Sequence, residues 1–208
     1  MRRAPALILS LIVYAAPVQA DDETWEKVSD AGGIVVYARN LDGVPTISLR
    51  GEAVIDARVQ DVFDAMKDNE TAHEWMPLVA AKKDLKAMGD NQRLEYTHVS
   101  MPWPLTDRYF VNTGTVEKLA GGGLKVFVKS VENPEYKEDD KVLGELKYSE
   151  FLLLPEEGGA KTRIKLEVNT DPKGLVPKFI VNAAQKSWPR DFLKGLMSQV
   201  AKRARLAH

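Results

Sequence analysis

The residues best suited to acid–base chemistry follow one another on a single predicted strand, as Glu95, Tyr96 and His98. A histidine titrates near neutral pH, and a carboxylate or phenol beside it can exchange protons with a bound substrate. Residues two apart on a strand share a face, so His98 lies beside Tyr96, either as a hydrogen-bonding core residue or as a general base. An enzyme that acts on a hydrophobic substrate through these residues is therefore one hypothesis.

Other patterns typical of catalysis or metal binding are missing from the sequence. There is no cysteine to serve as a nucleophile or to form a disulfide. His73 is followed by Glu74 and Trp75 without the second histidine of an HExxH zinc motif. Gly121 to Gly123 lie between two predicted strands, which indicates a hairpin turn and not a phosphate-binding loop. We expect no metal, no cofactor and no enzymatic activity.

An antiparallel meander must position these residues, because alternation of apolar and polar side chains recurs along most of the chain. In the final run Ile164, Leu166 and Val168 alternate with polar residues, which predicts one buried face and one solvated face. The predicted strands are 33–40, 46–55, 80–87, 92–101, 108–119, 124–131, 142–154 and 161–170, the first two separated by a turn at Asp42-Gly43.

Helical spacing occurs in four segments. Trp25 and Val28 suggest a short helix over 22–31, ended by Gly32-Gly33, and further helices are predicted near 59–66 and 70–75. The longest helix spans 175–206, with a kink or break expected just before Pro189. A sheet with one apolar face and a helix with one apolar stripe bury each other, so the sequence predicts an α+β fold.

Several segments of the chain resemble a known family. The bend from Pro102 to Arg108, the corner from Asp171 to Pro177, Trp75 and Arg50-Gly51 are similar to those of the START lipid-transfer family, the steroidogenic-acute-regulatory-protein-related domains. The resemblance runs from about residue 25 to residue 206. It implies a helix-grip fold, in which a curved antiparallel sheet wraps around a long C-terminal helix and encloses a hydrophobic cavity.

The resemblance implies that the cavity holds one lipid without a covalent link and that the protein transfers or senses it. Phospholipid, fatty acid and other hydrophobic molecules all remain open, because Gly114 stands where the steroid-carrying branch has an arginine of a charged pair. Arg108 matches the family's arginine after the bend, where it either orders the bend through Asp107 or Asp171 or contacts a head group. The expected lipid-binding residues are Tyr96, Trp103, Arg108, Phe110, Phe127, Tyr148, Phe179, Trp188 and Phe192, with Leu94 and Phe151 as further candidates.

Aromatic residues that face a sheet interior also form ordinary core, so a closed interaction module remains a third hypothesis. START domains open by moving the C-terminal helix and one loop. Here these correspond to 175–206 and 132–141, with Gly174 and Pro177 as candidate hinges. The loop 132–141 is rich in charged residues and can equally be a solvated surface loop.

The N-terminus predicts export from the cytoplasm. Arg2 and Arg3 precede an apolar stretch and a Val18-Gln19-Ala20 cleavage site, so we expect residues 1–20 to be a cleaved signal peptide and 21–208 to be one domain. Without Arg2 and Arg3, 27 basic residues stand against 30 acidic ones, a formal charge of −3 that disfavours nucleic acid. We expect a periplasmic or secreted monomer whose partners are a lipid and, transiently, a membrane surface.

Overall fold

One antiparallel β-sheet dominates the computed structural model, which describes residues 25–40, 46–176 and 178–206. The strands run in the order β1-β2-β3-β10-β9-β7-β6-β5-β4, and the short β8 pairs in parallel with β6. They are β1 (Glu26–Ala31), β2 (Ile34–Arg39), β3 (Ser48–Ile55), β4 (Val79–Ala87), β5 (Gln92–Val99), β6 (Arg108–Lys118), β7 (Leu124–Ser130), β8 (Val142–Leu143), β9 (Glu145–Glu156) and β10 (Lys161–Asp171).

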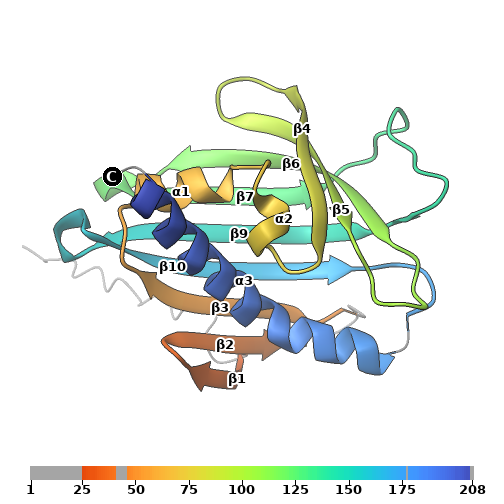
Figure 1. Ribbon diagram of the computed structural model, residues 1–208, viewed down its shortest axis with the longest axis horizontal. Coiled ribbons are helices and arrows are strands. Elements are labelled where there is room, and N and C mark those ends of the chain that lie inside the picture. Colours follow the sequence, from red (N-terminus) through yellow and green to blue (C-terminus); the bar gives the residue numbers. More distant parts are fainter. Residues whose placement is uncertain (1–24, 41–45, 177, 207–208) are drawn as a thin grey trace, which may run out of the picture.

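The α-helices of the described chain lie on one face of this sheet (Figure 1). They are α1 (Val59–Met66), α2 (Ala72–Trp75) and α3 (Lys178–Leu206). Helix α3 contacts β2 and β3 toward one edge of the sheet, while α2 contacts β4 at the other edge. The sheet therefore curls around its helices, and the predicted helix-grip fold is confirmed.

The core forms between the inner face of the sheet and the middle of α3. Ile164 and Leu166 of β10 are fully buried there with Phe192, Leu193 and Leu196 of α3. These are the alternating positions of the strand and the apolar stripe of the helix that the sequence indicated. Burial of such side chains contributes roughly 1.5–3 kcal/mol each, which makes this contact the main source of stability.

Two glycines allow α3 to approach its neighbours closely. A methyl group at Gly195 would overlap the backbone carbonyl oxygen of Trp75 at the end of α2. A methyl group at Gly51 of β3 would lie 3.0 Å from the Leu193 side chain and 3.1 Å from Pro189. The helix thus touches backbone on both sides at these positions, and a larger residue at either one would push it away.

The first element differs from its prediction. Residues 26–31 form strand β1, paired with β2, where we expected a helix over 22–31. Gly32 and Gly33 have φ angles of 65° and 76°, the left-handed conformation that a two-residue hairpin turn requires. The glycine pair therefore reverses a strand and does not cap a helix. The expected turn at Asp42-Gly43 lies outside the described residues.

One predicted strand is divided, and the long helix shows the first of the two outcomes expected near Pro189, a bend without a break (Figure 1). The run 142–154 is divided between β8, which pairs with β6, and β9, which pairs with β10 and β7. At Gly144, between them, the Phe110 ring occupies the space where a side chain would lie. Helix α3 continues through Pro189 without a break, and Figure 1 shows that it changes direction along its length. A proline removes one helical hydrogen bond, which permits bending without ending the helix.

Replacing Gly195 with alanine is expected to lower the free energy of unfolding by about 1–3 kcal/mol, because the added methyl group must displace the Trp75 backbone. Urea denaturation followed by circular dichroism measures this change. Lys194→Ala, at an exposed position one residue earlier on the same helix, is the matched control and should change stability by less than about 0.5 kcal/mol. An equal effect of both substitutions would contradict the close approach described here.

Candidate functional site

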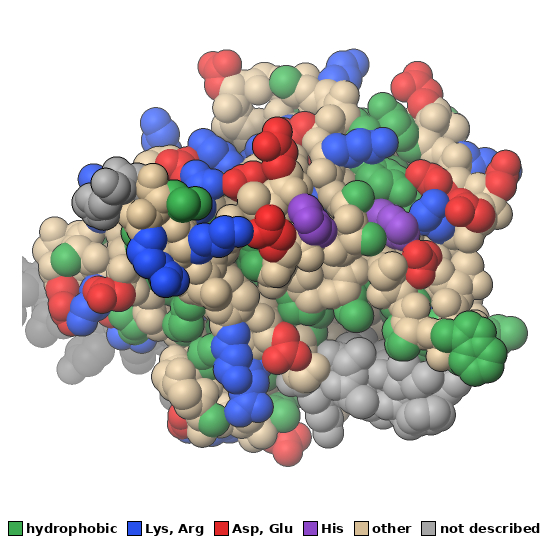
Figure 2. All heavy atoms as spheres, viewed as in Figure 1, with side chains coloured by type: hydrophobic (Ala, Val, Ile, Leu, Met, Phe, Trp, Pro, Cys, Tyr) green, Lys and Arg blue, Asp and Glu red, His purple; other side chains and the backbone are tan. Residues whose placement is uncertain are grey.

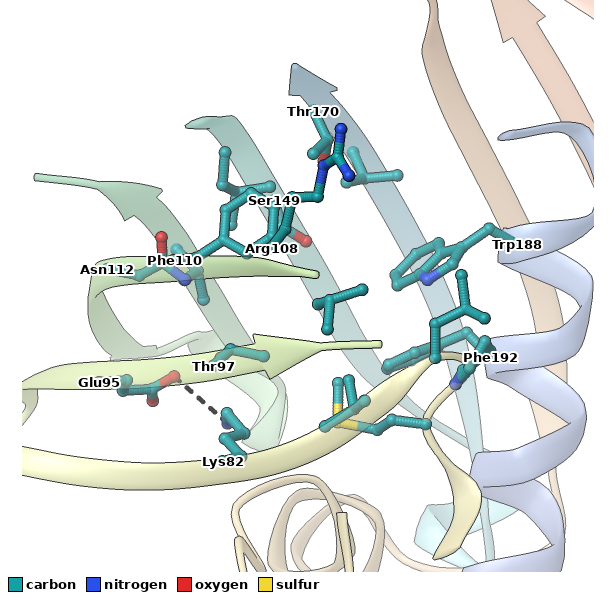
Figure 3. A pocket seen from close by; sticks show the side chains of 18 of the residues that line it. Lys82, Glu95, Thr97, Arg108, Phe110, Asn112, Ser149, Thr170, Trp188 and Phe192 are labelled. Atoms are coloured by element: carbon teal, nitrogen blue, oxygen red, sulfur yellow. Dashed lines mark ion pairs between the residues drawn. The ribbon is translucent and has the colours of Figure 1, made fainter. Parts of the chain in front are cut away.

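A cavity of about 290 Å³ lies between α3 and the inner face of the sheet. This volume is at the lower end of the range for ligand-binding cavities, roughly 300 Å³ and above. Most of the wall is apolar, and Figure 3 shows part of it from close by. The apolar lining includes Leu49, Phe63, Met66, Trp75, Met76, Val79, Val99, Met101, Phe110, Val126, Val128, Phe151, Val168, Trp188 and Phe192.

Helix α3 supplies the aromatic side of the cavity. The rings of Trp188 and Phe192 stack with their centroids 5.0 Å apart, and Phe192 also meets Trp75 at 5.3 Å and Phe151 at 5.6 Å. Phe192 is fully buried and connects the cavity to the core, whereas Trp188 is half-buried. Trp188 is thus the aromatic of α3 that is better placed to contact a ligand.

Strands β4 and β5 supply a buried charged cluster on the other side (Figure 3). The Glu95 carboxylate lies 3.2 Å from Lys82 Nζ and 2.9 Å from Arg93 Nε, and only 5% of the Glu95 side chain is exposed. Arg93, Glu95 and Thr97 are alternate residues of β5, so strand geometry alone points them all into the cavity. Sequence reasoning missed Lys82 and Arg93 and considered Glu95 only as a catalytic group.

Gly114 of β6 makes room for this cluster. It pairs across the strands with Arg93, and a methyl group at Gly114 would lie 3.1 Å from a Glu95 carboxylate oxygen. The cations beside Glu95 come from β5, as Arg93, and from β4, as Lys82. Within the described lining, Ser149 of β9 adds a hydroxyl group that is buried and has no hydrogen-bond partner.

Arg108 both lines the cavity and joins two segments of the chain. Its guanidinium donates hydrogen bonds to the backbone carbonyls of Thr106, Pro172 and Lys173, the latter two at 3.2 Å each. The side chain is only 2% exposed, and burial lowers the pKa of Arg108 from its ordinary value. The role in ordering the bend is therefore visible, but its hydrogen bonds go to carbonyls and not to the expected carboxylates.

Asp107 holds the bend from the other side. Its carboxylate accepts hydrogen bonds from the backbone N–H of Met101 at 2.9 Å and from the Ser100 hydroxyl, and it lies 2.8 Å from His98 Nε2. The Met101 N–H and then His98 keep the pKa of Asp107 below its ordinary value. The negative charge of Asp107 thus organises residues 100–107.

Four of the nine expected lipid-binding residues line the cavity: Arg108, Phe110, Trp188 and Phe192. Trp103 is 92% exposed on the bend. Phe127 is absent from the lining, to which its strand neighbours Val126 and Val128 both contribute. The Tyr148 hydroxyl donates instead to the Ser48 hydroxyl at 3.2 Å. Phe179 belongs to α3, but its side chain lies outside the described residues. Of the two further candidates, Phe151 lines the cavity and Leu94 does not.

Tyr96 lies on the outer face of the sheet, where it belongs to a second apolar cluster. Tyr96 stacks on Tyr109 with centroids 6.2 Å apart, and its hydroxyl donates to Glu138 at 2.8 Å. Burial, followed by this contact with Glu138, raises the pKa of Tyr96 to about 12. Leu94 and Tyr136 belong to the same cluster, so the loop 132–141 covers the outer face and contributes nothing to the cavity wall.

The three residues that the enzyme hypothesis requires do not point into one common site. Glu95 faces the cavity between two cations, whereas Tyr96 is on the outer face and His98 is hydrogen-bonded to Asp107. Among the described residues, no group of acidic, histidine or cysteine side chains could hold a metal ion. The site is therefore an apolar cavity with one charged wall.

Comparisons of both sequence and structure with known proteins identify related proteins. Residues 13–204 match the START domain family. The chain is 30% identical to an uncharacterized protein of Pseudomonas aeruginosa, over 94% of this chain and 96% of that protein. It is 27% identical to the phosphatidylcholine transfer protein of Rattus norvegicus, over 83% and 82%. A STAR-related lipid transfer protein from Xanthomonas axonopodis superimposes with a TM-score of 0.76 at 31% identity, covering 86% of this chain and 99% of that one.

Replacing Asp107 with asparagine is expected to lower the free energy of unfolding at pH 7 by about 1 kcal/mol, since the partly exposed carboxylate loses its charge-assisted hydrogen bonds. A depressed pKa in the folded state stabilises the fold only while the carboxyl is ionised. The difference from wild type should therefore shrink as the pH falls below the ordinary value of about 3.9 and through the folded-state pKa.

Denaturant titrations between pH 7 and pH 2 test this expectation. Asp139→Asn is the control, since Asp139 is 93% exposed and its only recorded contact among the described residues is a loose ion pair of 3.8 Å with Lys137. A difference between Asp107→Asn and wild type that stays constant with pH would show that the Asp107 charge does not stabilise the bend.

Proposed function

The chain belongs to the START domain family, and on that basis we propose that it binds a single lipid non-covalently in its internal cavity and transfers or senses it. One observation carries the proposal: the cavity is amphipathic, with apolar walls around Trp188 and charged groups around Glu95. An amphipathic molecule with an apolar tail and a polar end matches such an interior. The lipid-transfer proteins among the relatives support the same reading.

A carrier fits the site better than an enzyme does. Apolar burial yields roughly 0.8 kcal/mol per methylene group, so an acyl chain is held by the wall without covalent chemistry. Glu95 is occupied by ion pairs with Lys82 and Arg93, and His98 is engaged outside the cavity.

We further propose that the end of the molecule bearing the bend touches a membrane while the lipid is exchanged. Trp103 is 92% exposed on the β5–β6 bend, and Leu175 is 97% exposed just before α3. Arg108 joins these two segments through its bonds to Pro172 and Lys173. Figure 1 shows that they meet at the same end of the molecule, and Figure 2 shows exposed hydrophobic side chains there.

An aromatic ring and a leucine that protrude together can insert at the headgroup level of a bilayer. None of the helices in the described part of the chain combines the length and apolar character that a bilayer-spanning segment needs. The predicted signal segment 1–20 lies outside the described residues, and export to the periplasm or the medium, as a monomer, is part of the proposal.

Replacing Trp188 with alanine is expected to weaken lipid binding by about tenfold or more, since a large part of the apolar wall is removed. The melting temperature should fall proportionally less, because Trp188 is only half-buried. Fluorescent-lipid titration and thermal unfolding measure the two effects. Val54→Ala, at a partly exposed position outside the cavity lining, is the control, and equal losses of binding and stability in Trp188→Ala would make Trp188 a core residue.

Replacing Trp103 with alanine is expected to slow lipid transfer between vesicles and to weaken vesicle binding by about tenfold, because the largest exposed apolar side chain is lost. Affinity for a lipid probe dissolved as monomers, and the melting temperature, should stay at wild-type values. Vesicle cosedimentation and a fluorescence transfer assay measure the effect. The matched control is Met88→Ala, at an exposed apolar position in the β4–β5 turn. Unchanged transfer by Trp103→Ala would rule out this end as the docking surface.

A further inference from the structure

The charges that line the cavity are not balanced. Its described lining contains four cationic side chains and one carboxylate, Glu95; the cations are Lys67, Lys82, Arg93 and Arg108. Lys67 lies at the rim, 44% exposed and 2.7 Å from Asp64, so its charge is already compensated. The three deeper cations face a single acidic group within the cavity.

Glu95 cannot neutralise both of its neighbours. Lys82 is 13% exposed and has Glu95, at 3.2 Å, as its one ion-pair partner among the described residues. Arg93 shares the same carboxylate at 2.9 Å and reaches Asp84, which is 47% exposed, only at 3.5 Å. Among the residues that line the cavity, the charged cluster on β4 and β5 therefore has two cations and one carboxylate, and the second acidic partner of Arg93, Asp84, lies outside the lining.

Arg108 adds a second positive group to the wall. Its hydrogen bonds go to three backbone carbonyls, which orient the guanidinium without cancelling its charge. The nearby Asp107 carboxylate is engaged with His98, Ser100 and the backbone of Met101. Burying uncompensated charge is costly, and a negative charge on a ligand reduces that cost.

A neutral hydrogen-bonding group is also left without a protein partner. The Ser149 hydroxyl lies on the cavity wall, is buried, and makes no hydrogen bond within the described part of the molecule. Buried polar groups of this kind are satisfied in nearly all proteins, so an unpaired one on a cavity wall indicates a ligand or a water molecule. A hydroxyl group can donate to an anionic oxygen.

We propose that the cavity selects an anionic amphiphile, one whose carboxylate or phosphate is received by Lys82 and Arg93 while its apolar tail lies against Trp188. This inference rests on the proposed lipid-binding function and specifies its ligand class. A zwitterionic head group fits less well, because its cation would compete with Lys82 and Arg93 for Glu95. Figure 3 shows Lys82 and Glu95 on the strands at one side of the cavity and the Trp188 and Phe192 rings on α3 at the other.

Matched pairs of probes that differ in charge test the proposal. For the carboxylate, pyrene-labelled palmitate is compared with its methyl ester. For the phosphate, phosphatidylglycerol is compared with phosphatidylcholine of identical acyl chains, extracted from mixed vesicles and counted by mass spectrometry. The anionic member should be preferred by about tenfold in one arm or in both, and the arm identifies the head group.

Substitutions show whether each charged residue favours or opposes binding of the anionic probe. Lys82→Gln and Arg93→Gln should each reduce the preference for the anionic probe, whereas Glu95→Gln should increase it, because a competing carboxylate is removed. Lys86→Gln, at an exposed position of the same strand as Lys82 and outside the cavity lining, is the control and should leave the preference unchanged. Weaker anion binding by Glu95→Gln would contradict the proposal.

The wild-type comparison needs no variant, so the test survives even if a substitution prevents folding. Equal binding of acid and ester, together with equal extraction of the two phospholipids, would overturn the anion preference and leave lipid binding intact. Failure to bind any of the four probes would overturn both proposals at once.

Discussion

The close contact of α3 with the sheet and with α2 determines the rest of the structure. Gly51 and Gly195 let the helix touch backbone on both sides, and beyond them its C-terminal half is fixed by Arg203, 2.6 Å from Asp68. A curved sheet can follow a helix this closely only along part of its length. Pro189 and Leu193 meet Gly51 on one side of the helix, whereas the neighbouring Trp188 and Phe192 face a space that side chains do not fill, and that space is the cavity.

Much of the fold could be predicted from the sequence because alternation and helical spacing report directly on burial. The strand β10 and the apolar stripe of α3 appear where those patterns placed them. The errors arose where pairing with another segment decides the structure. A glycine pair such as the one after residue 31 can end a helix or close a hairpin, and the pairing of β1 with β2 decides which. The division at Gly144 accompanies a change of partner strand, from β6 for β8 to β10 and β7 for β9, which local patterns do not report.

The site was only partly predictable for a related reason. In strand β5 both faces are covered, the inner one by the cavity and the outer one by the loop 132–141, so apolar character did not reveal which face was which. The aromatic Tyr96 suggested the inner face and is on the outer one, while Arg93 and Glu95 point inward. The signal available was that Arg93 and Glu95 share one face of the strand while Leu94 and Tyr96 share the other.

The hydrogen bonds of Arg108 link the loop that carries Trp103 to the chain just before α3. One guanidinium therefore makes the two segments mechanically interdependent. A displacement of the helix start must release the Pro172 and Lys173 carbonyls, and a pull on the bend is transmitted to those same oxygens. Contact with a bilayer and access to the interior would then be a single cooperative event, with the arginine as its coupling element.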